Sequence, residues 1–125
     1  MLFQPHRYSR TRDLLHEFRD CFQAADVVRV VDIYAASETP IPGVDALALV
    51  EAMDGSDVRY SASFEKAVNE IVRVARPGDL VLTMGAGNIY QAAAMVLADL
   101  AASSAYRAPE EKPMKTAENG KKPEK

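Results

Sequence analysis

The first residues of the chain carry its most chemically capable side chains. An imidazole, a phenol, two hydroxyls and three guanidiniums follow one another in residues 3–13, namely His6, Arg7, Tyr8, Ser9, Arg10, Thr11 and Arg12. Cations at the start of a helix are unfavourable beside the positive end of its dipole unless an anion neutralises them. This stretch therefore indicates an anion-binding site, and the alternative is a solvent-exposed helix start without a ligand.

The elements around this stretch would position it at the edge of a sheet. Residues 1–4 are typical of a short strand, which Pro5 ends. Apolar side chains recur at helical spacing from Thr11 to Ala25, so we expect a helix there, with Ser9 or Thr11 as its cap. Open α/β sheets bind ligands between a strand and the helix that follows it, where backbone N–H groups face the ligand.

The rest of the chain alternates between strand and helix patterns. The β-branched run at residues 26–34 predicts a strand covered on both faces. We expect a stiff loop at 35–43, a helix at 46–53 capped by Asp45, a strand at 58–60, a helix at 64–75 capped by Ser63, a strand at 80–84 and a helix ending near 103. This order predicts an α/β fold with a mostly parallel sheet flanked by helices.

A glycine turn, Gly85-Ala86-Gly87-Asn88, directly follows the predicted strand at 80–84. Glycines between a strand and a helix allow the backbone to approach an anion or a nucleotide closely. The turn lacks the third glycine of a dinucleotide-binding motif and the Lys-Ser/Thr ending of a P-loop. A plain tight turn with Asn88 as helix cap is the alternative interpretation.

Composition excludes several classes of protein. The 125 residues are 48% hydrophobic, with a net charge of -3 and a pI of about 5.4, which argues against nucleic acid as a partner. No apolar run approaches the roughly 20 residues of a membrane span, so we expect no membrane association and a cytoplasmic location. Two histidines exclude a His-rich metal site, and we predict no metal ligands. We expect His16 on a helix surface and Cys21 in the core.

The two ends of the chain differ from its middle. Prolines, lysines and glutamates dominate residues 105–125, a composition typical of a disordered charged tail. Residues 1–104 would then form one domain. The first predicted strand is short and leaves the helix after it little to cover, so we expect this domain to be incomplete on its N-terminal side.

Three landmarks in the sequence resemble the C-terminal domain of the Mur ligases of peptidoglycan synthesis. They are residues 3–11, residues 32–45 (DIYAASETPIPGVD) and residues 78–89 (GDLVLTMGAGNI), and the similarity extends over residues 2–102. The Gln-Pro-His-Arg-Tyr order favours the members that add L-alanine over a sister group that ligates recycled murein peptides. The resemblance implies a Rossmann-like domain whose first strand and helix are missing.

The resemblance also implies an activity for the complete protein. Members of this group join L-alanine to UDP-N-acetylmuramate through an acyl phosphate, as ATP-dependent amide-bond-forming ligases that use Mg²⁺. This chain lacks the family's P-loop and magnesium-binding residues, so we expect it to bind neither cofactor alone and to be inactive without the N-terminal and central domains. A non-catalytic interaction or assembly module that keeps the fold is one alternative hypothesis, and a free-standing nucleotide-binding protein is another.

The family motif suggests roles for particular residues, although it assigns none of them to catalysis. Arg7 and Arg10 would contact the alanine carboxylate or the transferring phosphate, and His6 would orient the substrate. Gly85, Ala86, Gly87 and Asn88 would form the opposite wall of the site. Tyr34 and Glu38 would contact these residues and hold them in place without touching the substrate.

Overall fold

The computed structural model describes residues 1–55 and 57–103, so the predicted tail at 105–125 lies outside the described residues. Strands and helices alternate along these residues in the order β1 (Leu2–Phe3), α1 (Tyr8–Asp13), β2 (Val28–Val30), α2 (Ala46–Ala52), β3 (Val58–Tyr60), α3 (Phe64–Val74), β4 (Thr83–Met84) and α4 (Tyr90–Ala102). The α/β prediction is confirmed.

The strands form a four-stranded, fully parallel sheet in the order β3-β2-β1-β4. Leu2 lies opposite Arg29 on one side and Thr83 on the other. Because all strands run the same way, their carboxyl ends meet at one edge. That edge receives residues 4–7, 31–35 and 85–88.

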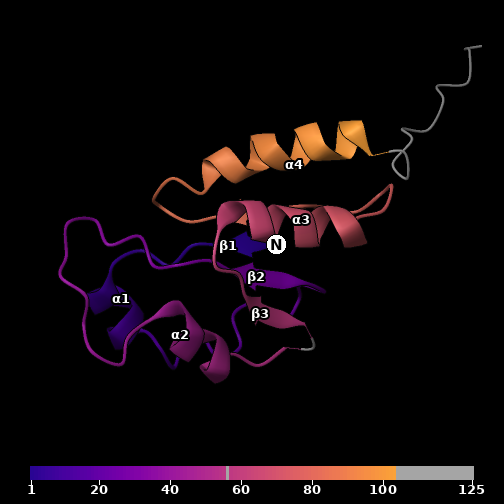
Figure 1. The fold of residues 1–125 in the computed structure, drawn as a ribbon. Coiled ribbons are helices and arrows are strands. Elements are labelled where there is room, and N and C mark those ends of the chain that lie inside the picture. The colour runs from indigo at the N-terminus through magenta and orange to yellow at the C-terminus, as the bar shows by residue number, and fades with distance from the viewer. Residues whose placement is uncertain (56, 104–125) are drawn as a thin grey trace, which may run out of the picture.

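Helices cover both faces of the sheet (Figure 1). α3 and α4 pack on one face, where Leu2 and Val31 meet Val68 of α3 and Val96 of α4. α2 lies on the other face, where a second cluster of buried residues contains Phe3, Val28, Val30 and Leu49. Adjacent positions of β1 and β2 point to opposite cores, as expected for strands buried on both sides.

Two helices begin as predicted, because their capping side chains bond the free N–H groups of the first turn. Asp45 accepts a hydrogen bond from the backbone N–H of Ala48 at 2.7 Å, before α2. Ser63 accepts one from Lys66 at 3.1 Å, before α3.

The helix predicted from Thr11 to Ala25 is wrong in both bounds. α1 begins at Tyr8 and ends at Asp13, and turns follow it. Phe18 and Phe22 both pack on Phe3, with ring centroids 5.5 and 4.8 Å apart. Their helical spacing therefore reflects packing on one shared partner, which a chain of turns satisfies as well as a helix does.

The predicted caps of this helix are also wrong. No side chain of α1 caps its N-terminus, and the Thr11 hydroxyl instead donates to the carbonyl oxygen of Arg7 at 2.8 Å. Thr11 therefore lies inside the helix, bonded to the preceding turn.

Three further predictions assigned too much regular structure or too much burial. The strands expected at 26–34 and 80–84 are shorter, since only Val28–Val30 and Thr83–Met84 pair as strands. Leu80 is 80% exposed at the edge of the sheet. Cys21 was expected in the core and is exposed, because its segment has no helical face to bury. His16 lies on the surface, as predicted, although in a turn.

Candidate functional site

His6 and Tyr34 form the centre of the candidate site. After β1 the chain continues beside residues 33–35, where the Tyr34 N–H donates to the Pro5 carbonyl and the Arg7 N–H donates to the Tyr34 carbonyl, both at 2.8 Å. The two aromatic rings stack with centroids 5.7 Å apart and planes 9° apart. His6 Nδ1 is buried and has no hydrogen-bond partner among the described residues. The stack fixes the imidazole at the carboxyl edge of the sheet.

Arg7 has a strained backbone. Its φ of 67° and ψ of 140° lie in a region that residues other than glycine rarely occupy. Such strain persists where the surrounding structure enforces it, and it clusters at functional sites. The two backbone hydrogen bonds to Tyr34, at Pro5 and Arg7, hold the chain in this conformation. The Arg7 side chain is exposed, directly before α1.

The three arginines of this stretch are not equivalent. Arg12 pairs with Asp13, with Nε and Oδ1 2.8 Å apart, and this contact raises the pKa of Arg12. Arg7 and Arg10 are exposed, and within residues 1–55 and 57–103 their guanidiniums form no hydrogen bond or ion pair. Arg7 and Arg10 are therefore the cations available to an external anion.

Glu38 supports α1 from the loop that follows β2. Its carboxylate accepts hydrogen bonds from the backbone N–H of Ser9 at 3.0 Å and from the Ser9 hydroxyl at 2.5 Å. These bonds hold the pKa of Glu38 below its usual range. The expectation that free N–H groups of this helix face a ligand therefore fails at Ser9, because Glu38 already occupies that donor.

The glycine turn packs closely against the end of β1 and against Tyr34. A Cβ atom on Gly85 would lie 2.7 Å from the carbonyl oxygen of Gln4. One on Gly87 would lie 2.5 Å from Cγ of Tyr34 and 2.7 Å from Oε1 of Gln4. Both glycines are therefore required by close approach, and not only by the turn itself.

Asn88 does not cap α4, contrary to one interpretation of the sequence. Its Oδ1 accepts a hydrogen bond from Nε2 of Gln4 at 2.9 Å, while Oε1 of Gln4 accepts one from the Ile89 N–H at 3.2 Å. Gln4, directly after β1, thus bonds the side chain of Asn88 and the N–H of Ile89, the residue before α4. Sequence reasoning assigned Gln4 no role, and its only signal was a polar residue at the end of an apolar run.

A cavity of about 250 Å³ opens at this edge of the sheet. Its lining comes from the ends of three strands and from the glycine turn, and includes Gln4, Asp32, Tyr34, Ser63, Phe64 and Asn88. The structure therefore brings Tyr34 and Asn88 to one cavity. His6 stacks on Tyr34, and Arg7 follows His6 in the chain. Arg10 lies in α1, and Glu38 is bonded to Ser9 of the same helix; neither Arg10 nor Glu38 lines the cavity.

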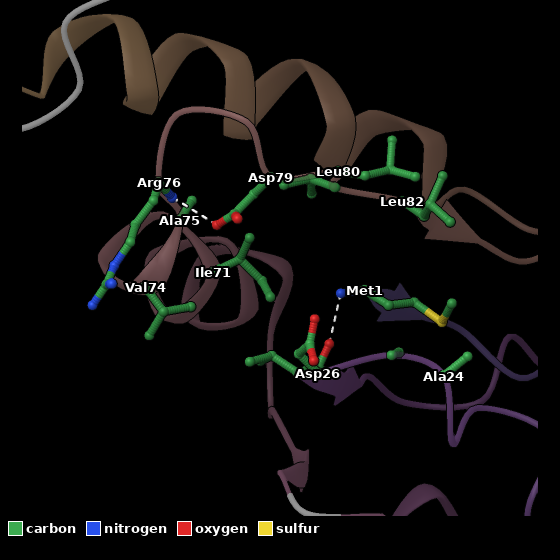
Figure 2. Close-up of a pocket in the computed structure, with 13 residues that line it drawn as sticks. Met1, Ala24, Asp26, Ile71, Val74, Ala75, Arg76, Asp79, Leu80 and Leu82 are labelled. Atoms are coloured by element: carbon green, nitrogen blue, oxygen red, sulfur yellow. Dashed lines mark hydrogen bonds between the residues drawn. The ribbon is translucent and has the colours of Figure 1, made fainter.

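A larger cavity of about 530 Å³ lies at the opposite edge, near the amino ends of the strands (Figure 2). It is lined mainly by apolar side chains, such as Ile71, Val74 and Leu80, and by none of the predicted site residues. The Met1 amino group donates to the Val27 carbonyl there, and burial lowers its pKa. We assign the candidate site to the smaller cavity because Tyr34 and Asn88 line it, and because Tyr34 stacks on His6, which Arg7 follows in the chain.

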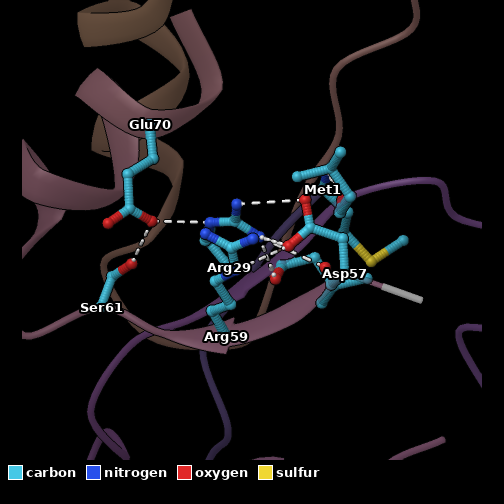
Figure 3. Close-up of polar contacts among 8 residues, drawn as sticks. Met1, Arg29, Asp57, Arg59, Ser61 and Glu70 are labelled. Atoms are coloured by element: carbon cyan, nitrogen blue, oxygen red, sulfur yellow. Dashed lines mark hydrogen bonds and ion pairs between the residues drawn. The ribbon is translucent and has the colours of Figure 1, made fainter. Parts of the chain in front are cut away.

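Arg29 is a charged residue that sequence reasoning missed (Figure 3). Its side chain is 4% exposed, with Nε 2.6 Å from Glu70 and a terminal nitrogen 3.0 Å from Asp57. The Ser61 hydroxyl also donates to Glu70, at 3.0 Å. This cation is fully satisfied inside the chain, so its role is structural, and its signal was a lone arginine within a β-branched strand.

The described part of the chain contains neither a cluster of metal ligands nor a membrane-spanning helix. No three His, Cys, Asp or Glu side chains in this part of the chain group together in a way that could hold a metal ion. None of the helices described here has the length and apolar character needed to cross a membrane.

Comparison with known proteins identifies the class. The family described as "Mur ligase, glutamate ligase domain" matches residues 2–87. The chain therefore belongs to the Mur ligase family and corresponds to its C-terminal domain, as the three sequence landmarks predicted.

Individual relatives show which members of the family the chain is similar to. The chain is 56% identical over 97 residues to UDP-N-acetylmuramate--L-alanine ligase of Acidobacterium capsulatum, covering 78% of this chain and 21% of that protein. It is 51% identical to the ligase of the same name from Solibacter usitatus, with the same shares covered, and 45% identical to that of Syntrophobacter fumaroxidans, covering 82% and 23%. The chain thus spans about a fifth of the length of these relatives.

Proposed function

We propose that this chain is the amino-acid-binding domain of an ATP-dependent ligase that adds L-alanine to UDP-N-acetylmuramate. The observation that carries the proposal is the pair of exposed guanidiniums, Arg7 and Arg10, which form no ion pair or hydrogen bond among the described residues and lie in the stretch that follows the His6–Tyr34 stack at the carboxyl edge of a parallel sheet. Relatives named for this reaction align with about four fifths of the chain, which supports the choice of substrates.

The proposed role of the arginines follows from charge. L-alanine carries a carboxylate, and formation of an amide through an acyl phosphate transfers a phosphate and develops negative charge on the reacting oxygen. Fixed cations bind such groups by charge-assisted hydrogen bonds and stabilise the developing charge. The strained backbone of Arg7 aims one of these cations without the freedom of a relaxed loop.

His6 would orient the substrate in this proposal. Its ring cannot turn freely, because it stacks on Tyr34 and its Nδ1 is buried. The glycine turn would form the facing wall, held in place because Gly85 packs on Gln4 and Gly87 packs on Tyr34.

ATP and Mg²⁺ belong to the other domains in this proposal. The described residues of this chain contain neither a P-loop nor a cluster of metal ligands. The proposal therefore gives them no part in binding ATP or Mg²⁺. The chain would act only when joined to the domains that hold ATP and the UDP-sugar. A cytoplasmic location is part of the proposal, because the reaction consumes ATP, which is supplied there.

The test is a complementation assay. The chain is mixed with a second polypeptide that supplies the UDP-sugar and ATP domains, and phosphate release is followed with UDP-N-acetylmuramate and L-alanine both present. We expect release that requires both substrates and that falls about 10- to 100-fold in Arg7→Ala and in Arg10→Ala, the size of one lost charge-assisted hydrogen bond. Arg12→Ala is the matched control and should retain activity, because Arg12 is already paired with Asp13.

A folded chain without activity, mixed with a partner shown to bind its nucleotides, would contradict this proposal. That result would favour a non-catalytic assembly module, and a pull-down between the two polypeptides would then measure assembly directly.

A further inference from the structure

We propose that Gln4 is a positioning residue that sets the distance between the two walls of the candidate site, an inference that rests on the proposed function. One wall is the stretch from His6 to Arg10, and the other is the glycine turn. Gln4 lies at the end of β1, is 5% exposed, and is bonded to the turn through both atoms of its amide.

The two bonds join segments that are far apart in the chain. The partners of the Gln4 amide, Asn88 and Ile89, lie 84 and 85 residues further on. The backbone adds a third bond, since the Gln4 N–H donates to the Met84 carbonyl at 2.9 Å. A displacement of the turn would leave the buried amide of Gln4 unpaired, which is costly for a polar group with little access to water.

An apolar side chain could not replace this amide. α4 begins at Tyr90 without a capping side chain of its own, so Oε1 of Gln4 supplies the acceptor for the Ile89 N–H. The same oxygen lies only 2.7 Å from the position that a Cβ on Gly87 would take. The Gln4 side chain therefore holds the start of α4 and limits how closely the turn approaches β1.

The link to the cations is short. Pro5, His6 and Arg7 follow Gln4 directly: Pro5 and Arg7 are hydrogen-bonded to the backbone of Tyr34, and His6 stacks on its ring. Gly87 packs against the same Tyr34 ring. A ligand that contacts both Arg7 and the turn is therefore sensitive to the Gln4 bonds, although Gln4 need not touch it.

The first experiment measures KM and kcat in the complementation assay. Gln4→Leu removes both bonds and should raise the KM for L-alanine about tenfold. Gln4→Glu keeps an acceptor for the Ile89 N–H, but it also adds a negative charge to a cavity proposed to bind an anion, so its effect is measured on hydrogen exchange and not on KM. Asn88→Ala removes only the partly buried bond to Asn88, and it replaces Gln4→Leu if that variant does not fold.

Ser61→Ala is the matched control, because it removes another buried hydrogen bond, the one to Glu70, far from the glycine turn. It should lower the melting temperature without raising the KM for L-alanine. A Gln4→Leu variant with the KM of Ser61→Ala would overturn the positioning role.

A second readout separates this inference from the proposed function. Hydrogen exchange of the Ile89 amide, measured on the chain alone, should accelerate at least tenfold in Gln4→Leu and stay near the unaltered rate in Gln4→Glu. Unchanged exchange in Gln4→Leu would refute the positioning role of Gln4, whatever the activity assay shows. Accelerated exchange together with an inactive mixture would refute the ligase proposal but not the positioning role of Gln4.

Discussion

Arg29 and Arg7 lie toward opposite ends of the same parallel sheet, and their charges are treated in opposite ways. Arg29 is buried toward the amino ends of the strands, between Glu70 and Asp57. Arg7 is exposed at the carboxyl ends, on a strained backbone and without a partner for its guanidinium among the described residues.

The difference separates structural charge from charge that awaits a ligand. A buried cation is tolerated only when its partners lie within the fold, so Arg29 contributes to stability and has no capacity left for a ligand. An exposed cation held in a strained conformation contributes little to stability, and its geometry has value only for binding. Changes at the two ends should therefore separate stability from activity.

The largest effect is expected at the buried end. Arg29→Met leaves Asp57 and Glu70 without their shared partner and should lower the free energy of unfolding by about 3 kcal/mol. Urea unfolding followed by circular dichroism measures this loss. Arg59→Ala is the control: Arg59 binds the same Asp57 at 2.9 Å but is 70% exposed, so its loss should be about 0.5 kcal/mol or less. Equal losses in both variants would refute the structural role of Arg29.

The next largest effect is expected at Arg7, at the exposed end, where a substitution should stabilise the chain. Arg7→Gly relieves the positive φ and should raise the free energy of unfolding by about 1 kcal/mol, while activity in the complementation assay falls about 100-fold. Arg7→Ala keeps the strain, so it should lose the same activity at unchanged stability. If Arg7→Gly retained full activity, the guanidinium would have no part in the site.

A smaller effect is expected at the glycine turn. The added Cβ of Gly87→Ala would meet Tyr34 and Gln4 and push the two walls apart, raising the KM for L-alanine about tenfold. Gly78→Ala is the control for a destabilising added carbon elsewhere: it strains a positive φ of 96°, has no atom within 4 Å of the added carbon, and lies outside the site. It should affect unfolding and leave KM unchanged. A rise in KM in both variants would mean that general destabilisation, and not contact with Tyr34 and Gln4, disturbs the site.

The smallest effect is a dependence of stability on pH. The hydrogen bond from Arg29 holds the pKa of Asp57 below its usual value of 3.8. The stabilisation is therefore complete above the unfolded pKa and is lost as pH falls through the lower folded pKa. We expect it to be about 1 kcal/mol at most, because Asp57 is partly exposed. Urea midpoints between about pH 6 and pH 2.5 should fall less steeply in Asp57→Asn, and equal slopes would contradict the assignment.

Local signals accounted for the correct parts of the sequence-based prediction. Asp45 and Ser63 act on donors three residues away, so their caps could be recognised without knowing what the helices pack against. The alternation of strands and helices likewise predicted the parallel sheet and the edge where its carboxyl ends meet.

Signals that depend on a distant partner misled the prediction. The spacing of Phe18 and Phe22 predicted a helix, yet Phe3 imposes it across a series of turns. Cys21 was placed in the core on the same pattern and is exposed. The roles of Arg29 and Gln4 depend on Glu70 and Ile89, which no local rule connects to them.

By itself the sequence determined the family, the order of elements and the set of candidate side chains, since residue types and short-range spacing carry that information. Only the tertiary structure decided which arginines are compensated, that Glu38 caps α1, and that Gln4 joins β1 to the glycine turn. The physical reason is that desolvation and hydrogen bonding are satisfied by whichever groups lie nearest in space. For Gln4 those groups lie more than 80 residues away along the chain.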